Sequence, residues 1–331
     1  MSPLGVAPCP PPRLEGTIAL ADGRRLGFAE YGDPTGPLVL WFHGTPGARR
    51  QVPLIGRRAA EVLGLRLVCL ERPGVGDSTD HTYAQMRDWA PDVAAVADRL
   101  GHERFMVVGM SGGGPYALAC AHELPSRVVA AGLLGPVVPT TGEEEEAHGL
   151  LGNAQRFNDV LPLLRVPLGA ALTNVVKVAT PIAHLAFTAF GMILPEGDRR
   201  VLGQPEIESM FIDDLVIGTR HQCRAFMNDI ILFGRPWGFH LADVAVPVYW
   251  WHGDADPFVR FEDARRAAAL LPDVEFVVRP EESHLGEFGA ADQVLAVLAD
   301  VWHATTPTPT LHAIVAEPAP EPPESGPAAI P

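Results

Sequence analysis

Short apolar runs recur along most of the chain and alternate with segments that have the spacing of amphipathic helices. Runs of this length, rich in Val, Leu and Ile, are typical of strands. They predict eight strands, at residues 16–20, 25–30, 38–42, 65–70, 105–109, 128–134, 246–251 and 274–278. The intervening segments predict helices at residues 49–63, 83–100, 115–122, 261–271 and 290–303.

The order of these elements predicts the fold class. Strands that alternate with helices form mostly parallel sheets joined by right-handed crossovers. The later strands are apolar at nearly every position, which is typical of strands covered by helices on both faces. Ala21-Asp22-Gly23 is a turn sequence, so the first two strands are expected to form a hairpin. We therefore expect an α/β fold with a mostly parallel, eight-stranded sheet.

Residues 140–241 interrupt this alternation. The segment is helix-like, and residues 160–194 are unusually apolar. The clean apolar stretches there are shorter than the ~18–20 residues of a membrane span, so no stable membrane insertion is expected. Two interpretations are compatible: a helical insertion that packs against the body, and a cap whose apolar inner face lines a substrate pocket. The core is then expected in residues 14–139 and 242–303.

The two ends of the chain differ in composition from the rest. Residues 1–13 are rich in Pro, and residues 304–331 are rich in Pro, Ala, Thr and Glu. Neither segment can bury a core, so both are predicted to be disordered. The first of them lacks the positively charged start and apolar centre of a signal peptide, and a cytoplasmic location is expected.

Composition and charge exclude several classes of function. The formal net charge of −15 argues against nucleic-acid binding, which needs a basic surface. The four cysteines are far apart and form no C-x-x-C, so neither a metal site nor a redox site is expected. No lysine follows the glycines of residues 72–78, so that loop is interpreted as structural and not as phosphate-binding. No cofactor is expected.

The sequence Gly109-Met110-Ser111-Gly112-Gly113 is a candidate catalytic motif. A lone G-x-S-x-G is a weak signal in a chain with 33 glycines. Here it lies between a predicted strand and a predicted helix, which is the setting of a nucleophile elbow. Ser111 is then expected at the apex of a sharp turn, with the positive end of the following helix directed at the site.

A serine hydroxyl needs a base that takes its proton and a third group that orients the base. His284 follows the last predicted strand, so its ring can reach the sheet edge where Ser111 is expected; the alternative is a surface loop histidine. Asp256 follows the preceding strand, is fixed by Pro257, and is the expected acid. Asp254 in the same loop is interpreted as a turn former.

The negative oxygen of a tetrahedral intermediate needs two N–H donors. Gly112, directly after the candidate nucleophile, is expected to supply one. Thr45 is expected to supply the other, because it follows the strand at 38–42 and the next residue, Pro46, has no N–H. The alternative is that His43-Gly44-Thr45-Pro46-Gly47 is only a tight turn.

Four motifs, in order and each after the appropriate strand, resemble those of the α/β-hydrolase superfamily: H-G-T-P-G, G-M-S-G-G, H-G-D-A-D-P-F-V and S-H-L-G. The resemblance covers residues 14–303 and implies that residues 140–241 form a helical cap. Ser111 argues against haloalkane dehalogenases and epoxide hydrolases, which have aspartate at the elbow. Cofactor-free haloperoxidases share the serine triad and stay an alternative. The superfamily serves many reactions, so it does not imply a substrate.

The expected function is hydrolysis of a small or medium apolar carboxylic ester through an acyl-enzyme. Prolyl iminopeptidases are similar in H-G-x-P-G but carry Gly where Thr45 stands, and an aminopeptidase or amidase is the second hypothesis. Such enzymes need cap carboxylates that hold a free amine, and the candidates are Glu196, Glu206, Glu208, Asp213 and Asp214. The expected partner is therefore a small-molecule ester or amide. A third hypothesis is a non-catalytic ligand-binding protein on the same fold.

Overall fold

The computed structural model describes residues 10–141, 144, 161–179, 196–218 and 223–305. An eight-stranded sheet forms its centre, in the order β1-β2-β4-β3-β5-β6-β7-β8. The strands are β1 (Leu14–Ala19), β2 (Arg25–Gly32), β3 (Leu38–Phe42), β4 (Arg66–Leu70), β5 (Phe105–Met110), β6 (Val128–Leu134), β7 (Val248–Gly253) and β8 (Val274–Arg279). Only the pairs β1–β2 and β2–β4 are antiparallel, so the predicted mostly parallel sheet is confirmed.

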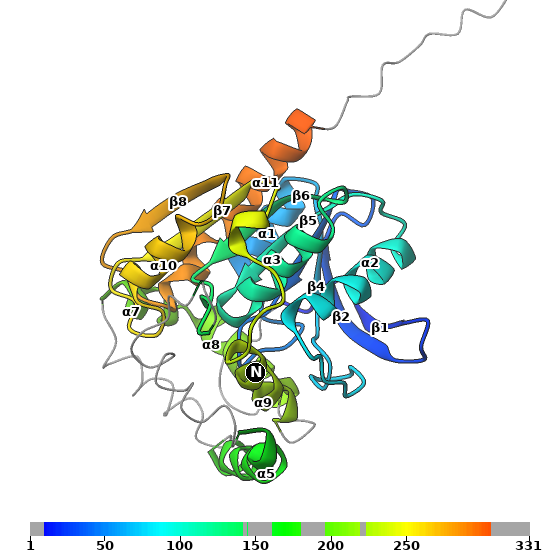
Figure 1. Cartoon of the computed structure of the whole chain (residues 1–331), viewed down its shortest axis with the longest axis vertical. Helices are drawn as coiled ribbons and strands as arrows, with labels where there is room; N and C mark the ends of the chain where they lie inside the picture. Colours follow the sequence, from blue (N-terminus) through cyan, green and yellow to red (C-terminus); the bar gives the residue numbers. More distant parts are fainter. Residues whose placement is uncertain (1–9, 142–143, 145–160, 180–195, 219–222, 306–331) are drawn as a thin grey trace, which may run out of the picture.

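Helices cover both faces of the sheet (Figure 1). They are α1 (Leu54–Val62), α2 (Ala90–Arg99), α3 (Gly114–Glu123), α10 (Phe261–Ala268) and α11 (Ala291–Thr305). Alternate residues of the strands enter two separate cores: Leu40 belongs to the core that contains residues of α2, α3 and α10, whereas Trp41 belongs to the core that contains residues of α1 and α11. Both side chains are fully buried, which explains why β3 is apolar at every position.

Some predicted boundaries were wrong by a few residues. The helix expected at 49–63 begins at Leu54, because Pro53 disfavours helical geometry in the residue before it. The helix expected at 83–100 begins as the 3-10 helix η1 (Met86–Trp89), which continues into α2. The strand expected from residue 246 starts after Pro247, which cannot donate a ladder hydrogen bond.

The ends of the described chain are tied to the body. The guanidinium of Arg13 forms an ion pair with the buried Glu30, and α11 continues to Thr305. Structure thus extends into both segments that were predicted to be disordered. The remaining parts of those segments, residues 1–9 and 306–331, lie outside the described residues.

In the described part of the segment between β6 and β7, four α-helices form the cap. They are α5 (Leu161–Ala179), α7 (Glu196–Leu202), α8 (Pro205–Gly218) and α9 (Arg224–Phe233). In Figure 1, α8 and α9 lie at one end of the sheet and α5 lies outside them. None of the helices in the described ranges is long and apolar enough to cross a bilayer.

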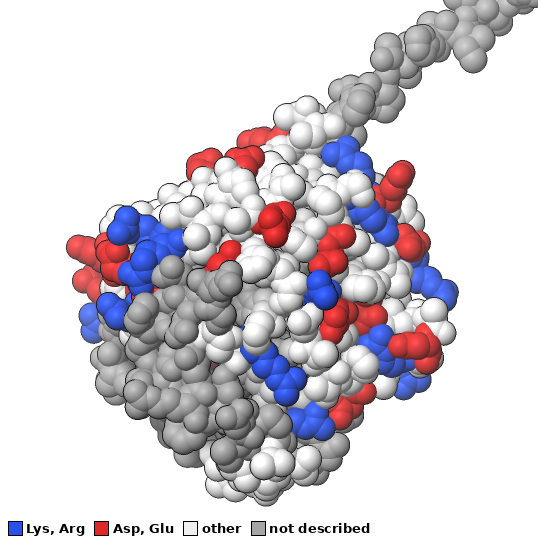
Figure 2. Space-filling view, viewed as in Figure 1, with Lys and Arg blue, Asp and Glu red and all other residues white. Residues whose placement is uncertain are grey.

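Charged side chains are mixed over the face of the molecule that Figure 2 shows. Acidic and basic groups alternate there, with no continuous basic surface on the described part of that face.

Candidate active site

Ser111 lies on the sharp turn between β5 and α3. Its φ of 48° is in the left-handed region, which residues other than glycine rarely adopt. The turn leaves no room beside it: a Cβ on Gly113 would lie 2.1 Å from the carbonyl oxygen of Phe42, and one on Gly109 would lie 2.6 Å from that of Gly113. The glycines around Ser111 are therefore a steric requirement of the turn.

The structure brings Ser111, His284 and Asp256 together. The Ser111 Oγ lies 2.7 Å from the His284 Nε2, and the His284 Nδ1 lies 2.7 Å from the Asp256 Oδ2. The other Asp256 oxygen accepts hydrogen bonds from the N–H groups of Phe258 (2.7 Å) and Val259 (3.0 Å). This carboxylate is thus held on both oxygens, which fixes the orientation of the imidazole.

Asp256 and His284 each stabilise the charged form of the other. Burial alone would lower the pKa of His284, but the charge and hydrogen bond of Asp256 outweigh it and raise this pKa above its ordinary value. Burial likewise opposes ionisation of Asp256, but His284 lowers its pKa below the ordinary value. The pair therefore favours an aspartate that stabilises an imidazolium.

A second histidine, His252, lies against the same carboxylate and is fully buried. Its Nε2 lies 2.9 Å from the Val259 carbonyl oxygen and 3.5 Å from the Asp256 Oδ2, while its Nδ1 accepts a hydrogen bond from the Trp250 indole. Burial lowers the pKa of His252. A neutral His252 leaves the charge of Asp256 available to His284.

The two residues that are expected to supply N–H donors, Thr45 and Gly112, lie next to each other. Thr45 follows β3 and Gly112 follows Ser111, and a Cβ on Gly112 would lie 2.3 Å from the Thr45 Oγ1. Both residues line the same cavity as Ser111 and His284. Only glycine fits at position 112, where the Phe233 ring also closes the space.

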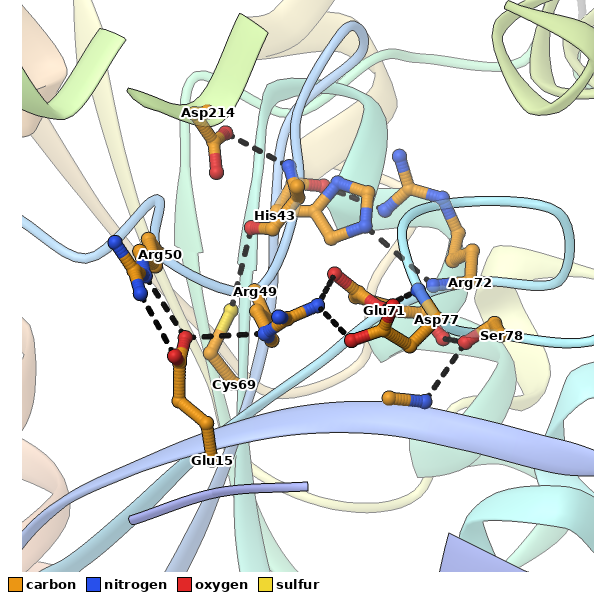
Figure 3. Close-up of polar contacts among 12 residues, drawn as sticks. Glu15, His43, Arg49, Arg50, Cys69, Glu71, Arg72, Asp77, Ser78 and Asp214 are labelled. Carbon is orange, nitrogen blue, oxygen red and sulfur yellow. Dashed lines mark hydrogen bonds and ion pairs between the residues drawn. The ribbon is translucent and has the colours of Figure 1, made fainter. Parts of the chain in front are cut away.

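The buried ion pair of Arg72 and Asp229 is hydrogen-bonded to the loop that carries Thr45. Arg72 donates to the carbonyl oxygens of His43 (2.6 Å) and Gly44 (2.9 Å) and to the Thr45 Oγ1 (2.8 Å). Figure 3 shows its guanidinium beside His43. Arg72 also forms a 2.7 Å ion pair with Asp229 of the cap helix α9, whose carboxylate accepts a hydrogen bond from the Thr45 hydroxyl at 2.6 Å.

A further cluster supports the loop that carries Arg72 (Figure 3). Glu71 is fully buried, and its carboxylate accepts hydrogen bonds from the Arg49 guanidinium (2.6 Å) and the Asp77 N–H (2.7 Å). The Arg49 guanidinium also forms an ion pair with Glu15 of β1, at 3.0 Å. Burial raises the pKa of Glu71, opposed by the charge of Arg49. The hydrogen bonds and ion pairs that Glu71 and Arg72 form are with other groups of the protein, which agrees with the interpretation of residues 72–78 as a structural loop.

Sequence reasoning missed Arg72 and Asp229. A usable signal was present, because Asp229 is a lone carboxylate in an apolar helical run and a buried charge needs a partner. The identity of that partner was not available, since the two residues are 157 positions apart.

A cavity of about 750 Å³ lies above Ser111 and His284. Its walls are mostly apolar, and they come from the cap helices and from the loops that carry the candidate triad. The lining contains five phenylalanines: Phe211, Phe226, Phe233, Phe258 and Phe288. The apolar inner face predicted for the cap is therefore present around this cavity.

Asp214 of α8 is a buried carboxyl in this lining. One of its oxygens accepts a hydrogen bond from the Ala48 N–H at 2.7 Å, as Figure 3 shows. The other oxygen has no hydrogen-bond partner among the described residues. Burial raises the pKa of Asp214 to about 7. Of the five cap carboxylates considered from the sequence, Asp214 is the one that lines the cavity.

The fold and the site define a hydrolase class. The family model described as "alpha/beta hydrolase fold" matches residues 37–288. The chain therefore belongs to the α/β-hydrolase fold family, as the motifs predicted.

Individual relatives fall into several groups. The proline iminopeptidase of Neisseria gonorrhoeae is 31% identical over 122 residues, which are 35% of this chain and 38% of that relative. The match thus spans well under half the length of that relative. An esterase from Exiguobacterium antarcticum has a TM-score of 0.63 at 18% identity, over 87% of this chain and 100% of the other. A bromoperoxidase from Bacillus anthracis has a TM-score of 0.63 at 17% identity, over 86% and 98%. These structural likenesses show the fold alone.

Proposed function

We propose that the protein is a serine hydrolase that cleaves a small or medium apolar carboxylic ester. One observation carries this proposal: Ser111, His284 and Asp256 form a continuous hydrogen-bonded chain, with 2.7 Å at each link, in the lining of an apolar cavity. A hydroxyl in such a chain is activated by the neighbouring imidazole.

The reaction follows from these positions. His284 takes the proton of Ser111 as the oxygen attacks the ester carbonyl, and it then gives that proton to the leaving alcohol. Asp256 holds the imidazole and stabilises its cationic form. Water attacks the acyl-enzyme with His284 again as base, which releases the acid and restores Ser111. These steps use only side chains, backbone and water.

The N–H groups of Thr45 and Gly112 are proposed to stabilise the oxyanion. They flank Ser111, and the loss of one such donor costs about a hundredfold or more in rate. Arg72 fixes the loop of Thr45 by bonding three of its oxygen atoms, so the donor is held in place before substrate binds.

The cavity supports the choice of an apolar acyl group. Its volume of about 750 Å³ and its phenylalanine-rich wall suit a small or medium hydrocarbon group. A series of nitrophenyl esters of rising acyl length tests this choice. We expect kcat/KM to rise with chain length, pass through a maximum and then fall as the cavity is filled.

The control for this series is Ser111→Ala. We expect kcat/KM to fall by at least about a thousandfold, because the substitution removes the nucleophile. Turnover that is equal in the wild type and in Ser111→Ala would reject the proposal. A Ser111-dependent reaction limited to amides would reject the ester assignment alone.

An aminopeptidase is the second candidate, and a specific observation favours it. Asp214 lines the cavity, and one of its buried oxygens has no hydrogen-bond partner among the described residues, so this carboxyl is the proposed partner of a substrate ammonium. The partial similarity to proline iminopeptidases points the same way. Cleavage of prolyl naphthylamide faster than of any ester in the series would favour this candidate.

A further inference from the structure

The cap helix α7 lies directly against the loop that carries His284. A Cβ on Gly197 would lie 2.7 Å from the Glu281 carbonyl oxygen and 3.0 Å from the Glu282 Cα. The backbones of helix and loop are thus in close contact, which a side chain at position 197 would prevent. The next residue of this helix, Asp198, is fully buried by the approach.

Asp198 accepts three hydrogen bonds from the two sides of His284. Its Oδ1 accepts from the N–H of Gly286 (2.7 Å) and of Ser283 (3.2 Å). Its Oδ2 accepts a hydrogen bond from the Ser283 hydroxyl. A carboxylate suits this place because all three neighbours are donors. Asp198 is therefore hydrogen-bonded to Ser283, directly before His284, and to Gly286, two positions after it.

The opposite side of the loop is bonded to the loop of Asp256. The Ala255 N–H donates to the Glu282 carbonyl oxygen at 3.0 Å, and the Glu281 N–H donates to the Asp254 Oδ1 at 2.8 Å. Asp254, which was expected to bond its own turn, thus bonds this neighbouring loop instead. The backbone around His284 is held between the acid loop on one side and the cap on the other.

We propose that Asp198 is a positioning residue for His284, through which the cap sets the place and the charge environment of the base. The role rests on the proposed function, in which His284 is the base. If α7 moved away from the body, the loop of His284 would lose all three hydrogen bonds to Asp198. The position of the cap and the position of the His284 imidazole are therefore coupled.

The charge of Asp198 adds to that of Asp256. Both anions favour the protonated form of His284, and each contributes to its raised pKa. Other titratable groups lie nearby, and Glu282 among them forms an ion pair with Arg279. His252 is buried and its pKa is lowered, and burial raises the pKa of Glu287 to about 8. Burial favours the neutral form of both groups, whereas Asp198 and Asp256 are the anions that raise the pKa of His284.

Asp198→Asn tests the charge without removing the shape. The amide oxygen can still accept from the two N–H groups, and its NH₂ can donate to the Ser283 hydroxyl. Loss of one anion lowers the pKa of His284. Because the base must be neutral in the free enzyme, the acid limb of kcat/KM should move to lower pH, by about half a unit or more.

Asp198→Ala tests the contribution of the three hydrogen bonds between Asp198 and the loop of His284. We expect kcat to fall by about tenfold or more as the imidazole loses its place relative to Ser111. The matched control is Glu196→Gln, which removes one negative charge from an exposed position on the same helix. We expect this control to keep the wild-type kcat and acid limb.

The outcomes separate this inference from the proposed function. If the wild type turns over esters through Ser111 but Asp198→Asn keeps the wild-type acid limb, the positioning role is rejected and the function stands. If Asp198→Ala does not fold, the acid limb of Asp198→Asn decides alone. If Ser111→Ala is as active as the wild type, the proposed function itself fails.

Discussion

At the scale of single residues, Asp214 distinguishes the two proposed substrate classes. It is a buried carboxyl whose pKa is raised to about 7, chiefly by burial. The folded protein therefore retains a proton that the unfolded chain releases above about pH 4. The stability of the fold therefore decreases as pH rises from about 4 to about 7, the pKa of Asp214 in the folded protein, and this group changes it no further above that, unless a bound cation compensates. An ester has no such cation, whereas the free amine of a peptide substrate does.

Asp214→Asn converts this difference into a prediction. The amide oxygen can keep the hydrogen bond from Ala48 while the negative charge is lost. We expect Tm to rise relative to the wild type at pH 8 and to be nearly unchanged at pH 4. If the protein is an ester hydrolase, kcat/KM for apolar esters should stay within a fewfold of wild type.

The neighbouring residue offers a control for this measurement. Asp213→Asn removes the same charge from a partly exposed carboxylate, and we expect little change in Tm at either pH. A loss of more than about a hundredfold on prolyl naphthylamide in Asp214→Asn, with esters unaffected, would instead support the aminopeptidase. Equal Tm values for the wild type and Asp214→Asn at pH 8 would contradict the assignment of a costly buried charge.

At the scale of elements, three cap helices attach to the body through buried aspartates. Asp198 of α7 bonds the His284 loop, and Asp214 of α8 bonds the N–H of Ala48. Asp229 of α9 pairs with Arg72 and bonds Thr45 and Tyr116. Apart from Tyr116, which lies in α3, the residues that these aspartates contact are on loops that follow strands at the edge where Ser111 lies. The cap is thus joined to the site by hydrogen bonds and an ion pair, whose geometry fixes how the helices lie on the loops.

The Arg72–Asp229 pair should be costly to break. The side chains are 2% and 5% exposed, so removing one partner leaves a buried charge without compensation. We expect Arg72→Met and Asp229→Asn each to lower the free energy of unfolding by about 3–5 kcal/mol, measured with denaturant. The double variant should lose less than the two single losses together, because neither charge is then left alone.

A surface pair supplies the comparison. Arg265 and Glu262 are 62% and 51% exposed, and Arg265→Met should change the free energy of unfolding by less than about 1 kcal/mol. Additive losses in the Arg72 and Asp229 variants would show that the two residues do not interact in solution as they do here.

At the scale of the whole molecule, the sequence was informative wherever structure follows from local pattern. Eight apolar runs predicted eight strands, and the signal is clearest for β3, β5 and β6, which are buried at every position and apolar throughout. The elbow was predictable because glycines at positions 109, 112 and 113 are a local steric requirement. Helix starts were less predictable, since the segment before Pro53 has helical periodicity without helical geometry.

The contacts between the cap and the site were not predictable in the same way. Asp198 reaches Gly286 over 88 positions, and Asp229 reaches Arg72 over 157. Periodicity and motif spacing carry no information on such pairs. Asp214 was one of five candidate carboxylates, and only its burial in the cavity wall separates it from the other four.

The central claim is that one serine, made reactive by one histidine, lies in this cavity. The most direct measurement is mass-spectrometric mapping of a fluorophosphonate adduct on the full chain. We expect one adduct, on the peptide that contains Ser111, absent from Ser111→Ala and formed at least about a thousandfold more slowly in His284→Ala. An unlabelled wild type, an adduct on another residue, or equal rates in the wild type and His284→Ala would contradict the account.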